Sequence, residues 1–153
     1  MLKKVLIIKA LLANLCLLAF AIVVSSATSA ETIYYVSSSL GNDQNNGLSK
    51  EAPWSSLKKI SSQTFEPGDV IKFKSGDTFF GSLDINSSGQ SGKPIVFNKY
   101  GGDLLPVIDA SSQNNGEHVA AIMIQDQDHI EISHLNIRNP VSYTHLRAHE
   151  TNQ

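Results

Sequence analysis

The chain of 153 residues contains a single cysteine, Cys16, which lies in an apolar stretch close to the N-terminus. With no second cysteine there is no intrachain disulfide, so the fold must be held by core packing and backbone hydrogen bonds. Lipid attachment at this cysteine is disfavoured, because Leu15 and Leu17 stand where that modification needs a small and a polar neighbour. Once the N-terminal stretch is removed, thiol chemistry is excluded as well.

The N-terminus has the three parts of a secretory signal. Three lysines lie within the first nine residues, residues 10–24 are almost wholly apolar, and residues 25–30 are small. The apolar core is shorter than the ~20 residues that a membrane-spanning helix needs. We therefore expect a cleaved signal peptide, with an uncleaved membrane anchor as the alternative.

The signal peptide is expected to comprise residues 1–30, with cleavage between Ala30 and Glu31. The small side chains of Thr28 and Ala30 would then fill the pockets of the peptidase, and a cut after Ala27 is the alternative. The mature protein is expected to be secreted, either to the extracellular space or to the periplasm, and to keep no membrane segment after cleavage.

Basic side chains are few in residues 31–140, the part between the signal and an atypical tail. A larger set of Asp and Glu faces them, and the whole-chain charge of −2 hides this excess because the signal contributes three lysines. An acidic surface argues against nucleic acid and anionic membranes as partners. It argues more weakly against a polyanionic glycan, because calcium could bridge like charges. The basic residues of this part are Lys50, Lys58, Lys59, Lys72, Lys74, Lys93, Lys99 and Arg138.

Helix-period patterns are scarce, and residues 53–60 are the exception. Proline is tolerated near the first turn of a helix, because the N–H that it lacks is unpaired there anyway. Trp54, Leu57 and Ile60 recur every three residues, so they share one helix face. Trp54, the single tryptophan, is therefore expected to be a buried packing residue, with sugar stacking as the alternative.

Short apolar runs separated by polar turns dominate the chain from residue 67 onward, and residues 33–36 form an earlier run of the same kind. Many short strands with polar turns predict an all-β fold, which could be a sandwich, a barrel or a β-helix. The later runs are residues 70–73, 79–85, 95–97, 107–108, 121–124, 130–132 and 135–137.

The last two of these runs favour one of the three architectures. Only Ser133 and His134 separate them, and a hairpin at this place would want Asn-Gly or other Gly-rich chemistry. A bend between successive sides of a solenoid rung does not need positive φ at both positions, so it fits these residues better. Stacked rungs would lie about 4.8 Å apart, with the inward residues forming apolar columns.

A series of motifs covers nearly all of residues 33–139: YYVSSSLGND from Tyr34, APWSSL from Ala52, FEPGDVIKF from Phe65, GDTFFG from Gly76, SSGQSGKPI from Ser87, PVID from Pro106 and IEISHLNIRN from Ile130. This series resembles the opening of the pectate-lyase-like family of right-handed parallel β-helix proteins. The resemblance implies an all-β, right-handed parallel β-helix (solenoid) for residues 31–140, with an N-terminal cap that holds one short helix. About four rungs of a little over 20 residues would fit before the fold is truncated.

The resemblance specifies the fold well but the activity poorly, because the family includes polysaccharide lyases, glycoside hydrolases, epimerases and proteins of no known activity. It implies part of a secreted polysaccharide-active protein, a polysaccharide lyase or a glycoside hydrolase, for which calcium could serve as cofactor. The alternative is a non-catalytic glycan-binding or adhesive surface protein. The family's catalytic positions would mostly come after these rungs, so no catalytic residue is assigned and the chain itself is expected to be inactive.

Some polar residues could carry chemistry but also have a plainer interpretation. Asp126 and Asp128 could form a carboxylate pair, although Asp is favoured in polar turns. His118, His129 and His134 could be catalytic, but a histidine beside a turn or a strand more often packs or is solvated.

Two further motifs have the same ambiguity. Residues 42–47 hold the oxygen ligands and the turn glycine of a calcium loop, but they lack the Asp spacing and the distal Glu of an EF-hand. A solvated turn is therefore the favoured interpretation, because these residue types favour turns for local backbone reasons. Asn139 could begin an asparagine ladder, which would be structural.

Residues 141–153 do not continue the apolar alternation, which stops at Pro140. Residues 141–151 resemble, residue for residue, one reading frame through the transposase-end adapter used to build short-read sequencing libraries. We therefore expect a non-native tail, and raw reads across the codons for residues 139–140 would settle the point. His145 and His149 have the spacing of two zinc ligands on a helix, but they have no expected role in such a tail.

Overall fold

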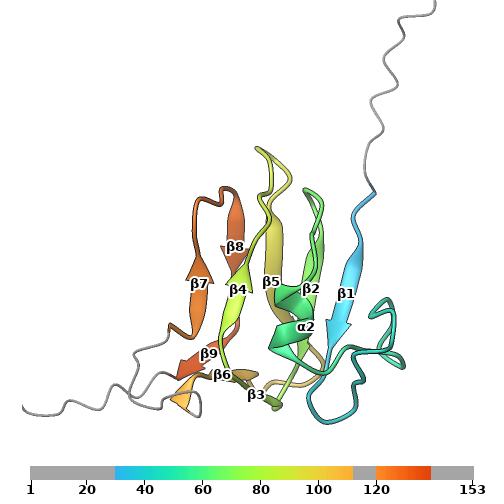
Figure 1. Ribbon diagram of the computed structural model, residues 1–153. Coiled ribbons are helices and arrows are strands. Elements are labelled where there is room, and N and C mark those ends of the chain that lie inside the picture. The colour runs from blue at the N-terminus through green and yellow to red at the C-terminus, as the bar shows by residue number, and fades with distance from the viewer. Residues whose placement is uncertain (1–29, 112–119, 139–153) are drawn as a thin grey trace, which may run out of the picture.

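The computed structural model describes residues 30–111 and 120–138, and within these ranges it contains nine strands and one helix (Figure 1). The expected signal up to residue 29 and the tail 141–153 lie outside the described residues. No helix of the described part has the length and apolar character needed to cross a membrane. The elements are β1 (Ile33–Val36), α2 (Leu57–Ser61), β2 (Val70–Lys74), β3 (Thr78–Phe80), β4 (Leu83–Ile85), β5 (Ile95–Tyr100), β6 (Val107–Asp109), β7 (Ile122–Ile124), β8 (Ile130–Ile132) and β9 (Asn136–Arg138).

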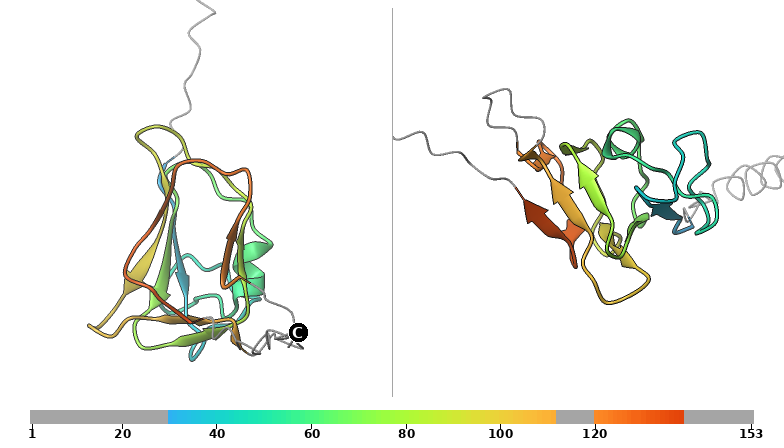
Figure 2. Two further views of the ribbon diagram at one scale, coloured as in Figure 1. Left: turned by 90° about the vertical axis from the view of Figure 1, so that its left-hand side faces the viewer. Right: turned by 90° about the horizontal axis from the view of Figure 1, so that it is seen from below.

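The strands form three parallel sheets in the described part of the chain: sheet A (β1-β2-β5-β8), sheet B (β3-β6-β9) and sheet C (β4-β7). From β2 onward the chain visits A, B and C in turn, returns to A at β5, and returns again at β8. The two views of Figure 2 show the sheets around a common interior. The expected all-β class is confirmed, and parallel pairing excludes a sandwich built from hairpins, whose strands are antiparallel.

One passage of the chain through the sheets is called a level. The strand register gives the number of residues between one level and the next. In sheet A, Ile33 pairs with Val70, Val70 with Val96, and Val96 with Glu131, which gives separations of 37, 26 and 35 residues. The expectation of a little over 20 residues per level is therefore wrong. The extra residues lie in the connections between strands, because the strands themselves have only three to six residues.

The core forms because alternate side chains point into the space between the sheets. Ile71 and Phe73 of β2 are fully buried, whereas Lys72 between them is only partly buried. Ile71 lies beside Phe97 of the next level in register, and the Phe73 ring contacts the Phe79 ring of sheet B edge to face at 5.2 Å. Full burial of one such side chain stabilises the fold by about 1.5–3 kcal/mol.

Trp54 covers the N-terminal end of this core. Its side chain is only 3% exposed, its ring stacks on Tyr34 at 4.9 Å, and its Nε1–H donates to the carbonyl of Asn45 at 2.9 Å. The backbone N–H of Trp54 donates to the carbonyl of Tyr35 at 3.0 Å, which places this segment beside β1. The expected packing role of Trp54 is confirmed.

The helix is shorter than expected. It begins at Leu57 rather than at Pro53, with Ser56 as the N-cap whose hydroxyl accepts from the Lys59 N–H at 3.0 Å. The backbone at Trp54 cannot be helical, because it pairs with β1 as an isolated parallel bridge. Leu57 and Ile60 nevertheless point into the core together with Trp54, as their spacing predicts.

Sharp corners join the sheets. The apolar run 79–85, taken as one strand from its composition, is divided at Gly81 and Ser82 into β3 of sheet B and β4 of sheet C. The corner between β8 and β9 is the expected bend at Ser133 and His134, and of these two only His134 has positive φ, at 57°. A bend of this kind, rather than a hairpin, is confirmed there.

In sheets B and C the last described strand leaves its inward side chains partly in water. Ile124 and Ile137 are 44% and 50% exposed, whereas their register partners one level earlier, Ile85 and Ile108, are 3% and 0% exposed. The residue type and the direction of the side chain are the same in each pair. Burial therefore depends on a following level that covers the side chain.

Gly47 provides a test of the Trp54 cap. Its φ is 74°, and a Cβ at this position would lie 2.5 Å from Cε2 of Trp54. Gly92 has nearly the same φ, 76°, but a Cβ there would meet nothing within 4 Å. We expect Gly92→Ala to cost about 1–2 kcal/mol from backbone strain alone. Gly47→Ala should cost a further 1–3 kcal/mol or so from overpacking against the tryptophan ring.

The measurement is urea denaturation followed by the fluorescence of the single tryptophan. Equal losses of unfolding free energy in the two variants would show that the contact between Gly47 and the Trp54 ring is not tight, and this account of the cap would be wrong.

Candidate functional site

The most strongly hydrogen-bonded carboxylate of the described part belongs to Asp77, which is 6% exposed. It accepts hydrogen bonds from the hydroxyls of Ser37 at 2.8 Å and Ser39 at 2.9 Å, and from the Lys74 ammonium at 3.1 Å. Burial raises the pKa of Asp77, but these hydrogen bonds outweigh burial and hold the pKa below its ordinary value. All of its partners are protein groups that join the segment after β1 to the turn after β2, so the role of Asp77 is structural.

The side chains of residues 42–47, predicted to form a solvated turn with a calcium loop as the alternative, bond to the backbone. Oδ1 of Asp43 accepts from the backbone N–H groups of Ser55 and Ser56, at 2.8 and 3.0 Å. Oδ1 of Asn42 and Oδ1 of Asn46 accept from backbone N–H groups two residues further along. Backbone donors thus occupy these oxygens, which supports the interpretation of the loop as a turn.

The polar residues proposed from the sequence lie at corners of the last level. Asp126 and His129 have φ of 55°, His134 has φ of 57°, and all three side chains are exposed. Asp128 is also exposed, and its backbone N–H donates to the hydroxyl of Ser88 at 3.2 Å. Asp and His are among the residues that adopt this left-handed conformation most readily, which explains their place in these turns. His118, Asn139, His145 and His149 lie outside the described residues.

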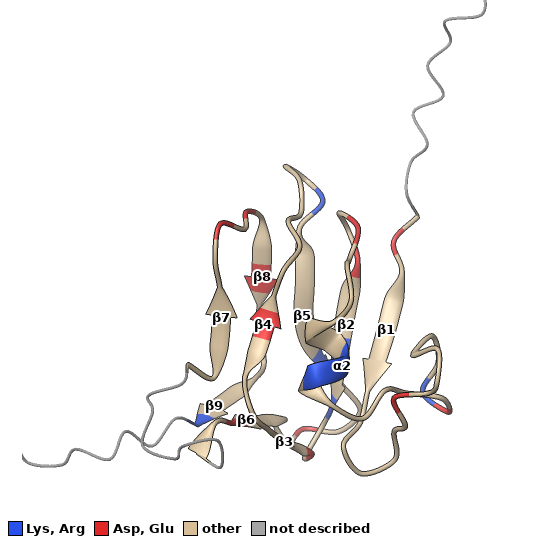
Figure 3. Cartoon of the chain, viewed as in Figure 1, with Lys and Arg blue, Asp and Glu red and all other residues tan. Residues whose placement is uncertain are grey.

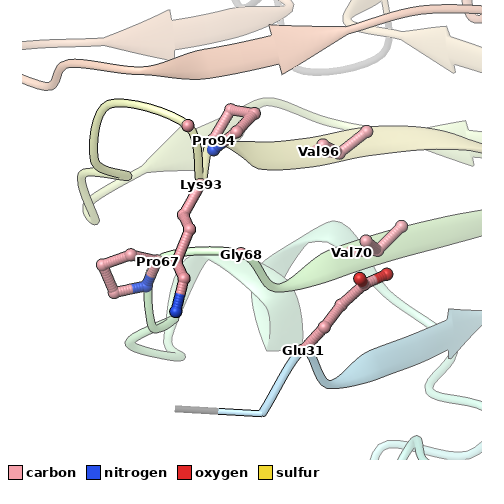
Figure 4. Close-up of a pocket in the computed structure, with 8 residues that line it drawn as sticks. Glu31, Pro67, Gly68, Val70, Lys93, Pro94 and Val96 are labelled. Atoms are coloured by element: carbon pink, nitrogen blue, oxygen red, sulfur yellow. The ribbon is translucent and has the colours of Figure 1, made fainter. Parts of the chain in front are cut away.

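A depression of about 360 Å³ lies on the outer face of sheet A, where β2 and β5 begin (Figure 4). Its floor includes Val70 and Val96, which are register partners on adjacent strands. Figure 4 shows the Lys93 side chain reaching toward Pro67 and the Glu31 carboxylate pointing toward Val70. An apolar floor with one anionic and one cationic group at its rim suits the binding of a small polar molecule.

The outer face of sheet A continues from this depression as a row of polar and aromatic residues. Tyr35, Lys72 and Asn98 are register partners on three adjacent strands. The Tyr100 ring contacts the Tyr35 ring edge to face at 5.1 Å. Burial, assisted by the charge of Asp77, raises the pKa of Tyr100 to about 12, so its phenol stays protonated and can donate a hydrogen bond.

A second row crosses the outer face of sheet B. Phe80, Asp109 and Arg138 are register partners on β3, β6 and β9. The Phe80 ring is 65% exposed, and the Asp109 carboxylate accepts from the N–H and the hydroxyl of Ser111. Hydrogen bonds from Ser111, together with the charge of Arg138, hold the pKa of Asp109 below its ordinary value. The row thus holds an exposed aromatic ring, a buried ionised carboxylate and an exposed guanidinium on successive levels.

Sequence reasoning did not single out this second row. Strand alternation could have placed Phe79 inside and Phe80 outside. The register that brings Phe80, Asp109 and Arg138 together was not available, because the length of each level varies.

None of three depressions on the described surface has two carboxylates in its lining. Hydrolysis uses two carboxyl groups on either side of the scissile bond. Among the depressions lined by described residues, the one on sheet A has only Glu31, and one beside α2 has only Asp84.

The chain is similar in sequence to two bacterial proteins. It is 30% identical over 138 residues to a lacto-N-biosidase of Bifidobacterium longum, and the match covers 75% of this chain and 9% of that protein. It is 33% identical over 99 residues to the uncharacterized protein YwoF of Bacillus subtilis, with 65% of this chain and 20% of that protein covered. A scan against protein-family models finds no match.

Solved structures give a consistent result. The GH136 lacto-N-biosidase of Eubacterium ramulus superposes with a TM-score of 0.63 at 28% identity, over 70% of this chain and 20% of that one. A rhamnogalacturonan lyase superposes with a TM-score of 0.59 at 19% identity, over 69% of this chain and 28% of that one, which shows a shared fold only.

The chain spans 9% and 20% of the length of the curated relatives that it matches. The comparisons thus connect it with carbohydrate-active enzymes and do not favour the alternative of a non-catalytic adhesive protein.

The hydrogen bonds of Asp77 predict an acid-sensitive contribution to stability. Because its folded pKa lies below the unfolded value of about 3.9, the stabilisation is present above pH 4 and is lost as the pH falls through the folded pKa. We expect Asp77→Asn to lower the free energy of unfolding by about 2 kcal/mol at pH 7. The difference from the unsubstituted protein should shrink toward pH 3.

The matched control is Asp103→Asn, because Asp103 is exposed. Its effect at pH 7 should stay within about 0.5 kcal/mol. Denaturation curves at several pH values give both numbers, and a loss in Asp77→Asn that does not change with pH would contradict the role given to the ionised carboxylate.

Proposed function

We propose that this chain is part of a secreted carbohydrate-active enzyme, and that the enzyme is a glycoside hydrolase acting on an oligosaccharide or polysaccharide. The observation that carries the proposal is the similarity to lacto-N-biosidases in both sequence and structure, at 30% and 28% identity. The lyase is the weaker candidate, because the rhamnogalacturonan lyase resembles this chain at 19% identity and its likeness concerns the fold alone.

The architecture proposed for the enzyme is a right-handed parallel β-helix. Three observations support it: the sheets are parallel, the chain visits them in a repeating order, and one apolar core joins all three. In the described part of the chain, sheet A has four strands, sheet B three and sheet C two. In this architecture each sheet is one side of the solenoid, and its outer face is open to a substrate.

We place the reacting carboxyl groups outside the described residues. Three depressions on the described surface each have at most one carboxylate in their lining, and Asp126 and Asp128 lie in an exposed turn. The described levels would then contribute the capped end of the core and surfaces that bind the glycan at a distance from the reaction.

The reaction class is tested with the purified longer protein and two substrates. We expect it to release a disaccharide from an oligosaccharide that ends in lacto-N-biose, detected by chromatography, with no new ultraviolet absorbance on oligogalacturonide. A rise in absorbance would identify an unsaturated product and hence a lyase. No product from either substrate, with retained glycan binding, would support the non-catalytic alternative.

Secretion is tested by the N-terminus of the exported protein, which we expect to begin at Glu31. Replacement of the small residue at the cleavage site by Ala30→Arg should leave the precursor uncut. Ala27→Arg is the matched control, and it should leave cleavage after Ala30 unchanged. If Ala27→Arg blocks processing and Ala30→Arg does not, the alternative site after Ala27 is the correct one.

A further inference from the structure

We propose that Phe80 is the stacking platform of a neutral-saccharide binding site between helix α2 and sheet B. The inference rests on the proposed function for the class of ligand, but it concerns a surface that is separate from the reacting groups.

Phe80 is unusual for an aromatic residue of this chain. Its neighbour Phe79 is 2% exposed in the core, whereas Phe80 is 65% exposed on the opposite face of β3. Among the described residues, every other Phe, Tyr and Trp is buried or partly buried. A single exposed apolar side chain needs no explanation, so the surroundings of the ring must decide whether it has a role.

Phe80 lines two depressions. One, of about 310 Å³, is lined by Lys58, Ser82 and Asp84 as well as Phe80. The other, of about 230 Å³, is lined by Ser38 and Thr78, again with Phe80. Their sizes lie near the lower end of the range of small-molecule pockets, roughly 300 Å³, which suits individual sugar rings better than a large ligand.

The rim of these depressions offers unused hydrogen-bonding groups. Oδ1 of Asp84 accepts from the hydroxyl of Ser82 at 3.2 Å, and within the described residues its second oxygen has no protein donor. The Lys58 ammonium has no ion pair there either, and Figure 3 shows the basic residues of α2 beside the acidic residue of β4. A sugar ring has one apolar face of C–H groups and a polar edge of hydroxyls, so it can stack on Phe80 while its hydroxyls reach these groups.

The charges around Phe80 select a neutral sugar over a uronate. The larger depression is lined by one carboxylate, Asp84, and one ammonium group, Lys58. The hydroxyls of a neutral sugar can donate to the carboxylate and accept from the ammonium group. A uronate would bring a second carboxylate close to Asp84, and like charges at close range repel.

The test measures binding of lacto-N-biose and of digalacturonate to the longer protein by titration calorimetry. We expect the neutral disaccharide to bind more tightly, and Phe80→Ala to weaken its binding about tenfold. Phe80→Tyr should bind within about twofold of the unsubstituted protein, because the ring is retained. Leu104→Ala is the matched control, since Leu104 is also an exposed apolar residue, at 73%, and it should change nothing.

Circular dichroism and the thermal midpoint of each variant show whether the fold is intact, and an exposed ring should be replaceable without loss of either. Unchanged affinity in Phe80→Ala, or tighter binding of digalacturonate, would overturn the inference. The enzyme assay separates this result from the proposed function. If Phe80→Ala hydrolyses the substrate with the same KM as the unsubstituted protein, only the inference is refuted. If binding depends on Phe80 but no substrate is hydrolysed, only the proposed function is refuted.

Discussion

Parallel pairing in register is the constraint on which the other features of this molecule depend. Because paired strands run in the same direction, the inward side chain of one level lies against the inward side chain of the next, as Ile71 does against Phe97. The apolar core is thus a set of columns that continue through the levels rather than a closed cluster. A column has two ends, and each end must be covered by something other than another identical strand.

At the N-terminal end this cover is provided by Trp54 and helix α2. The tryptophan ring stacks on Tyr34, and the Trp54 backbone exchanges hydrogen bonds with Tyr35 and Ser37, so the C-terminal end of β1 is covered against further strand pairing. The buried carboxylate of Asp77 ties the segment after β1 to the following turn. The cost of burying that charge is offset because hydroxyl, amide and ammonium donors surround it.

The sequence allowed the strands and the core to be predicted, because both depend on local alternation, whereas the parallel direction of the strands was implied by the family resemblance. Ile33–Val36 and the short runs after residue 67 were recognised in this way, and so was the bend at Ser133 and His134. The length of each level and the start of the helix were not predictable, because they depend on contacts between distant segments. The pairing of Trp54 with β1 stopped the helix from beginning at Pro53, and no periodicity contains that information.

The same reasoning explains why the candidate binding residues were harder to find than the core. Phe79 and Phe80 are chemically identical neighbours, yet packing uses one and leaves the other in water, because strand geometry turns them to opposite faces. The inward side chains are packed in the apolar columns of the core, so only the outward side chains can contact a ligand. An outward residue can bind a ligand only together with its neighbours, as Phe80 has Asp109 beside it. These two residues are 29 positions apart in the sequence, and only the strand register brings them together. A surface of this kind can therefore be assigned once the level lengths are known, and not before.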